Sequence, residues 1–68
     1  MILGENVKKF RKKANMSQRE LATKVLVSNT VISNIEQDKT SPSLQLTVFI
    51  ADVLGCTVDD LIKEKWNK

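Results

Sequence analysis

The chain has 68 residues, of which 41% are hydrophobic and 28% charged, and its formal net charge is +3 at pH 7. This length accommodates one domain, placed at residues 1–68, and the composition excludes an intrinsically disordered chain. One cysteine cannot form an intrachain disulfide, and without histidine no cysteine–histidine zinc site can form, so we expect no metal and no cofactor.

Five short helices are predicted, because apolar residues recur at helical spacing and do not alternate as in strands. The predicted ranges are 3–14, 17–25, 28–37, 43–54 and 57–66. The first helix has one apolar stripe, with Arg11 at its edge and the lysines pointing away from it. The stripe consists of Leu3, Val7, Phe10 and Ala14.

Capping residues predict where the second and third helices begin. Ser17 and Glu20 have the spacing of a capping box, and Ser28 is a favoured N-cap residue. Because only Leu26 and Val27 separate the two helices, the helices must turn sharply and pack as a unit.

The outward face of the third helix is polar and uncharged. It carries Asn29, Thr30, Ser33, Asn34 and Gln37, opposite the apolar Ile32 and Ile35. Lysine and glutamate would be better surface helix formers, whereas amides and hydroxyls pair well with base edges. These residues alone leave two interpretations open, a DNA-reading surface and a solvated helix that happens to be uncharged.

The fourth helix is predicted to begin after Ser43 and to end before Gly55. Its expected core side consists of Leu44, Val48, Ala51 and Leu54. A second apolar stripe, Leu46, Phe49 and Val53, lies roughly opposite. Because a helix with two apolar sides is normally buried on both, we predict a homodimer seam there, joined by Val58 and Trp66. Intrachain cover by Trp66 or Ile2 is the alternative.

The fifth helix is predicted to be capped by Thr57. Asp59 and Asp60 fall in its first turn, where the positive end of the helix dipole favours carboxylates. These two side chains diverge and are not an acid–base or metal pair. Cys56, in the preceding turn, is expected to be a small buried hydrophobic residue.

Several motifs occur together at fixed spacing. They are Ser17–Ala22, Val27–Ser28, Ile32–Glu36, Pro42–Leu44 and Ala51–Gly55. In these segments the chain resembles the phage-repressor and Cro-like helix-turn-helix family, also called the XRE family. The resemblance implies an all-α, five-helix, lambda-repressor-like domain in which the second and third helices form the helix-turn-helix.

The same resemblance implies roles for individual residues. The third helix would enter the major groove of double-stranded DNA. The base-edge readers would be Asn29, Thr30, Ser33 and Asn34. The DNA-backbone contacts would be Gln18, Ser28, Gln37, Lys39, Thr40 and Ser41. Arg11 and Glu36 would form a structural ion pair. Two residues depart from the family pattern: Leu26 stands where the family usually has glycine, and Asp38 stands where it often has glycine or asparagine.

We therefore expect a sequence-specific transcription regulator, a repressor that binds a palindromic operator as a homodimer. The charge distribution agrees, because residues 1–40 carry eight basic and four acidic side chains whereas residues 41–68 carry three and four. A segment resembling a signal peptide or a membrane span is absent, so we expect a cytoplasmic location.

Two other classes of function compete with DNA binding. The absence of histidine, tyrosine and a glycine-rich phosphate loop argues against an enzyme, and we expect no catalytic residue and no small-molecule ligand. An antitoxin-like protein-interaction module is the stronger rival, because it uses the same fold. A polar face flanked by basic residues favours nucleic acid over that alternative.

Overall fold

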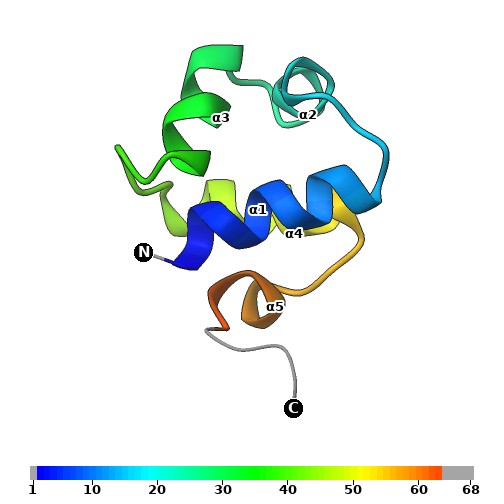
Figure 1. Cartoon of the computed structure of the whole chain (residues 1–68), viewed down its shortest axis with the longest axis vertical. Helices are drawn as coiled ribbons and strands as arrows, with labels where there is room; N and C mark the ends of the chain where they lie inside the picture. The colour runs from blue at the N-terminus through cyan, green and yellow to red at the C-terminus, as the bar shows by residue number, and fades with distance from the viewer. Residues whose placement is uncertain (1, 64–68) are drawn as a thin grey trace.

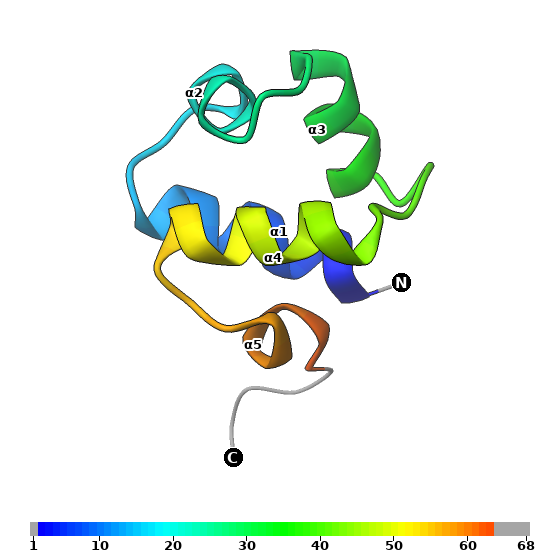
Figure 2. The same ribbon diagram turned by 180° about the vertical axis from the view of Figure 1, so that it is seen from behind.

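The structure, a computed structural model, describes residues 2–63, which form five α-helices and no strand. The helices are α1 (Ile2–Lys13), α2 (Gln18–Lys24), α3 (Asn29–Glu36), α4 (Leu44–Leu54) and α5 (Val58–Ile62). In Figure 1, α1 crosses the middle of the molecule in front of α4, with α2 and α3 on one side of this pair and α5 on the other. Seen from behind in Figure 2, α4 lies in front of α1.

A hydroxyl side chain caps the start of each helix from α2 to α5. The hydroxyl oxygens of Ser17, Ser28, Ser43 and Thr57 accept a hydrogen bond from the backbone amide three residues later. In α2 and α5 the side chains of Glu20 and Asp60 complete a capping box by accepting from the cap amide. These bonds satisfy amides that have no partner within the helix, so the helix starts are encoded locally.

The core lies between the helices and draws on all five. Its fully buried large side chains are Val7, Leu21, Ile32, Ile35, Ile50 and Leu61. The helix α1 packs against α3, α4 and α5, and α2 packs against α3 and α4. The pair α2 and α3 is therefore packed against α1 and α4.

Gly4 allows α1 to approach the C-terminal end of α3. A Cβ atom at this position would overlap the backbone carbonyl oxygen of Ile35 and lie 2.9 Å from that of Glu36. A third neighbour, the Asp38 side chain, could rotate away, but these two backbone atoms could not, so rotation of a side chain cannot relieve the clash. The orientation of α3 on α1 thus depends on a residue without a side chain.

Asn6 is a buried polar residue that ties the first helix to the last. Only 2% of its surface is exposed. Its Nδ2 atom donates to the backbone oxygens of Leu61 at 2.9 Å and Lys63 at 2.8 Å. These carbonyls belong to the last turn of α5, where helix oxygens lack partners, so Asn6 acts as a C-cap supplied from another helix.

The side of α4 that faces the core agrees only in part with the predicted one. Thr47, Ile50, Ala51 and Leu54 are its buried residues. The prediction is confirmed for Ala51 and Leu54 and was wrong for Leu44 and Val48, which are 75% and 42% exposed. Thr47 can be buried because its hydroxyl donates to the backbone oxygen of Ser43 at 2.8 Å.

The fifth helix is shorter than predicted. It ends at Ile62, because the backbone of Lys63 is extended, and the amide of Lys63 makes the last helical bond, to the oxygen of Asp59. The predicted continuation to residue 66 is therefore wrong at Lys63, and residues 64–66 lie outside the described part of the chain. No helix among residues 2–63 is long and apolar enough to cross a bilayer.

Candidate nucleic-acid interface

The helix α3 presents the polar face identified in the sequence. Asn29 and Thr30 in its first turn are exposed, and Ser33 and Asn34 one turn later are half-buried. Ile32 and Ile35 on the opposite side are at most 1% exposed. The four predicted base readers therefore share one helix and one general direction, held outward by a fully buried underside.

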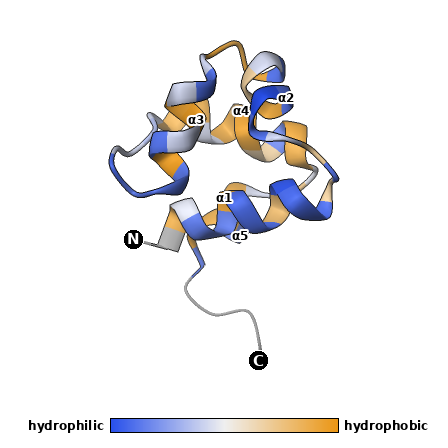
Figure 3. Cartoon of the chain, turned by 45° about the horizontal axis from the view of Figure 1, so that its top comes forward, coloured by the Kyte–Doolittle hydropathy of each residue, from blue (hydrophilic) through white to orange (hydrophobic). Residues whose placement is uncertain are grey.

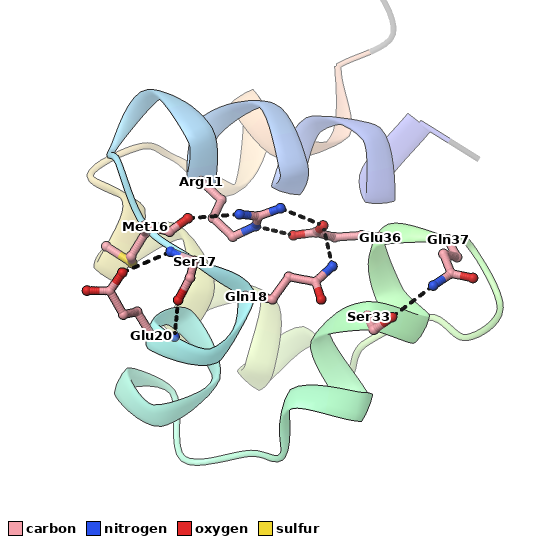
Figure 4. A network of polar contacts seen from close by, with 8 residues as sticks. All are labelled: Arg11, Met16, Ser17, Gln18, Glu20, Ser33, Glu36 and Gln37. Atoms are coloured by element: carbon pink, nitrogen blue, oxygen red, sulfur yellow. Dashed lines mark hydrogen bonds and ion pairs between the residues drawn. The ribbon is translucent and has the colours of Figure 1, made fainter.

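Arg11 and Glu36 form the ion pair expected from the resemblance. The Arg11 Nε donates to Glu36 Oε2 at 2.7 Å, and a second guanidinium nitrogen donates to Glu36 Oε1 at 3.1 Å. The exposed fractions of the two side chains are 9% and 3%. A third guanidinium bond reaches the backbone oxygen of Met16 at 2.8 Å (Figure 4). The pair joins α1, the turn before α2, and the end of α3.

Gln18 belongs to the same network. Its Nε2 donates to Glu36 Oε1 at 3.0 Å, as Figure 4 shows. The sequence predicted Gln18 as a contact to a DNA phosphate and missed this bond. Because an amide nitrogen has two protons, the bond to Glu36 leaves the second proton for another acceptor. Gln18 therefore links the start of α2 to the end of α3.

Ser33 and Gln37 form a separate pair one helical turn apart. The Gln37 Nε2 donates to the Ser33 hydroxyl oxygen at 2.8 Å (Figure 4). Gln37 is exposed and occupies the C-cap position of α3. Sequence reasoning placed both residues on the outward face but gave no reason for a contact between them.

The segment after α3 carries three of the residues that were predicted to contact the DNA backbone. Lys39, Thr40 and Ser41 are all exposed. The Lys39 amide donates to the oxygen of Asn34 at 2.9 Å, so the chain turns back against the helix before it leaves. Asp38 makes this turn with a φ of 60°. Ser28, also predicted as a backbone contact, uses its hydroxyl to cap α3.

The predicted homodimer seam is divided between packed and exposed side chains. Leu46, Val53 and Val58 are partly buried against the chain's own core. Phe49 is 47% exposed, and it is accompanied on α4 by Leu44 and Val48. Figure 3 shows α4 as largely hydrophobic, in contrast to the mostly hydrophilic α1. We call Leu44, Val48 and Phe49 the α4 patch; Trp66 lies outside the described residues.

Among residues 2–63 no three histidine, cysteine, aspartate or glutamate side chains lie close enough to hold a metal ion. Partial burial, with a smaller contribution from the charge of Asp60, raises the pKa of the Cys56 thiol. Cys56 is half-buried beside the core, close to the expected role of a small hydrophobic residue.

The sequence model of a helix-turn-helix family matches residues 7–61. The chain belongs to this family. The assignment agrees with the resemblance to phage repressors and Cro-like proteins, and the family is one of transcription regulators rather than enzymes.

Relatives of this helix-turn-helix domain occur in archaea and in phages. An uncharacterized HTH-type transcriptional regulator of Archaeoglobus fulgidus is 39% identical over 66 residues, which cover 91% of this chain and 93% of the relative. The immunity repressor protein of Bacillus phage phi105 is 32% identical over 65 residues. That match covers 96% of this chain but 45% of the phage protein, so the chain spans less than half of that repressor.

A solved repressor–operator complex has the same fold as this domain. The P22 c2 repressor bound to a synthetic operator matches with a TM-score of 0.88 and 32% sequence identity. The match covers 96% of this chain and 98% of that one. The predicted lambda-repressor-like fold class is thereby confirmed.

The helix-turn-helix keeps a left-handed turn without a glycine. Leu26, where the resemblance leads one to expect glycine, has a φ of 64°. Its side chain is 83% exposed, so little packing offsets the strained backbone. A left-handed conformation costs a residue with a Cβ atom roughly 1 to 2 kcal/mol. The turn before α3 is therefore built at the expense of stability.

Proposed function

We propose that the chain is a transcriptional repressor that binds a palindromic operator in double-stranded DNA as a homodimer. The observation that carries the proposal is the outward face of α3, a set of amides and hydroxyls on a helix whose other side is fully buried. Membership of a regulator family and the likeness to a repressor bound to its operator support it. Because the ligand is DNA, we propose the cytoplasm as its location.

In the proposed complex α3 lies in the major groove. Asn29, Thr30, Ser33 and Asn34 read base edges, and an asparagine that pairs bidentately with adenine contributes about 1 to 3 kcal/mol of discrimination. The contacts to the DNA backbone are made by Gln18 at the start of α2 and by residues on either side of α3, namely Ser28, Gln37, Lys39, Thr40 and Ser41. Their contacts to phosphate set the register of the protein on the duplex and carry no direct sequence information.

The Arg11–Glu36 pair supports this arrangement by fixing α3 relative to the start of α2. Glu36 accepts from Arg11 on α1 and from Gln18 on α2, so three helices share one carboxylate. A side chain that reads a base edge must be positioned to within a fraction of an ångström, which a well-satisfied buried network favours.

The homodimer is proposed to form through the α4 patch. Leu44, Val48 and Phe49 are large apolar side chains that a monomer would leave in contact with water. A twofold pair of domains would double the number of base contacts and bind half-sites about one helical turn, or ~34 Å, apart. Partly buried Leu46, Val53 and Val58 would lie at the edge of this contact.

Selection of bound sequences from a random duplex pool tests the proposal. We expect enrichment of an imperfect palindrome with the wild-type protein, and loss of preference at one symmetric base pair with Asn34→Ala. The variant Lys39→Ala should instead weaken binding to all sequences similarly and lower the salt dependence of the affinity, because it removes a phosphate contact.

The protein-interaction alternative makes a different prediction for the same experiment. An antitoxin-like module that acts only on another protein would enrich no sequence, and its affinity for duplex DNA would not change with Asn34→Ala. Chemical-shift mapping with duplex DNA that left residues 28–37 unmoved would also contradict the proposed function.

A further inference from the structure

The contact between Ser33 and Gln37 determines which hydrogen-bonding group Ser33 can offer outward. A serine hydroxyl has one proton to donate and two lone pairs that accept, so an isolated serine on this face could contact either kind of base edge. The bond from Gln37 Nε2 at 2.8 Å occupies one lone pair of the Ser33 oxygen. The hydroxyl proton is not used in that bond and must point elsewhere.

In the part of the chain that the structure describes, the Ser33 proton is donated to no protein group. Thr47 shows the contrasting case, because its hydroxyl donates to the backbone oxygen four residues earlier, at 2.8 Å. Thr47 is buried and has no other use for its proton, whereas Ser33 is half-buried on the outward side of α3. The Ser33 proton thus remains available to a ligand.

We infer that Gln37 polarises Ser33 into a hydrogen-bond donor, so that Ser33 selects an acceptor on the major-groove edge of the operator. This inference rests on the proposed function. In the major groove the acceptors are purine N7, guanine O6 and thymine O4, whereas cytosine offers only its amino group as a donor. Ser33 therefore favours purine or thymine at the base that it contacts and disfavours cytosine. Gln37 is a positioning residue in this role, because it acts through Ser33.

The position of Gln37 and the amide group of its side chain suit this role. Gln37 lies at the C-cap, where its backbone amide donates to the oxygens of Ser33 and Ile35, so its Cα is fixed one turn from Ser33. A glutamine at this position can donate to Ser33, and a glutamate of the same size can only accept. The pair can therefore be reversed by a nearly isosteric substitution.

The experiment measures the relative affinity of the full chain for operators that carry each of the four base pairs at every position. Ser33→Ala first identifies the symmetric position at which preference is lost. Gln37→Glu should then lower the preference for the favoured base over cytosine at the same position by about five-fold or more, because the carboxylate takes up the Ser33 proton. Gln37→Met should weaken the preference without reversing it.

Gln45→Glu is the matched control for the added negative charge. Gln45 is exposed on α4, so its substitution should weaken binding to all sequences equally, through charge alone. In the Ser33→Ala background, Gln37→Glu should produce no further change in preference at that position. Ser33 on α3 and Gln37 at its C-cap are not core residues, and thermal unfolding of each variant should match the wild type.

The outcomes separate the inference from the function on which it rests. Selective binding by the wild type, with an unchanged base preference in Gln37→Glu, would overturn the role of Gln37 and leave the proposed function standing. A uniform loss of affinity in Gln37→Met and Gln37→Glu would assign Gln37 to the DNA backbone alone and would likewise overturn it. Absence of any sequence preference in the wild type would overturn both.

Discussion

The helices α3 and α4 are built alike on the inside and differ on the outside. Each begins at a serine whose hydroxyl accepts from the third amide of the helix, at 3.3 Å from Val31 and 3.1 Å from Leu46. Each buries isoleucine in the common core. Outward, α3 presents amides and hydroxyls, whereas α4 presents the α4 patch of Leu44, Val48 and Phe49.

This difference separates what makes the fold from what makes the function. Caps and buried side chains are shared, so they explain why both segments are helices in one core. The outward faces contribute little to that core, and we propose different ligands for them, nucleic acid for α3 and a second copy of the chain for α4. Substitutions on the inside should therefore change stability, and substitutions on the outside should change binding.

The largest loss of stability is expected when the Arg11–Glu36 ion pair, which joins α3 to α1, is broken. Glu36→Met leaves the guanidinium of Arg11 almost buried without its carboxylate, which should lower the free energy of unfolding by about 3 to 4 kcal/mol. The double variant Arg11→Met/Glu36→Met should recover most of this loss. Urea denaturation of the four proteins in the cycle measures the coupling, and a coupling near zero would mean that the pair does not fix α3.

A slightly smaller loss is expected at the point where α3 touches α1. Gly4→Ala should lower the free energy of unfolding by about 2 to 3 kcal/mol, because the added Cβ meets backbone oxygens that cannot rotate away. In an open helical position the same change would raise stability. Gly55→Ala is the control, since no atom lies within 4 Å of a Cβ there and only the positive φ opposes it. Equal losses in the two variants would contradict the close approach.

A gain in stability is expected at the turn that leads into α3. Leu26→Gly should raise the free energy of unfolding by about 1 kcal/mol, or the melting temperature by about 5 °C, because glycine adopts the left-handed backbone without strain. Leu26→Ala keeps the strain and should give no such gain. Melting temperatures of both variants that equalled the wild type would show that the leucine is not strained.

The smallest effect on stability is expected on the outside of α4. Phe49→Asp should change the free energy of unfolding by less than about 0.5 kcal/mol, because the side chain is half exposed. The same variant should reduce the dimer fraction in analytical ultracentrifugation and weaken binding to every palindromic operator. Asn34→Ala should leave the dimer fraction unchanged. A wild-type protein that stayed monomeric at high concentration would remove the role assigned to the α4 patch.

Local signals made most of the helix-turn-helix predictable from sequence. The hydroxyls of Ser17, Ser28 and Ser43 accept from amides three residues away, so these caps can be predicted from four consecutive residues of the sequence. The polar face of α3 follows from helical periodicity alone. The ion pair between Arg11 and Glu36 came from the family resemblance, because nothing in composition brings together two residues 25 positions apart.

Features that depend on satisfied polar groups or close backbone contact were missed. Hydropathy favoured Leu44 and Val48 over Thr47 as core residues, yet Thr47 satisfies its hydroxyl within its own helix and is buried. Gly4 carries no signal until α3 is placed beside it. Gln18 was expected to face a phosphate, and its bond to Glu36 depends on where a third helix puts a carboxylate.

The bonds from Asn6 have a consequence for how the chain is made. Their acceptors in Leu61 and Lys63 lie 55 and 57 residues further along the sequence. During translation, the first helix leaves the ribosome long before its amide can reach these oxygens, and domains complete folding as units. The contact between the side chain of Asn6 and the last turn of α5 can therefore form only after nearly all of the described chain has been made.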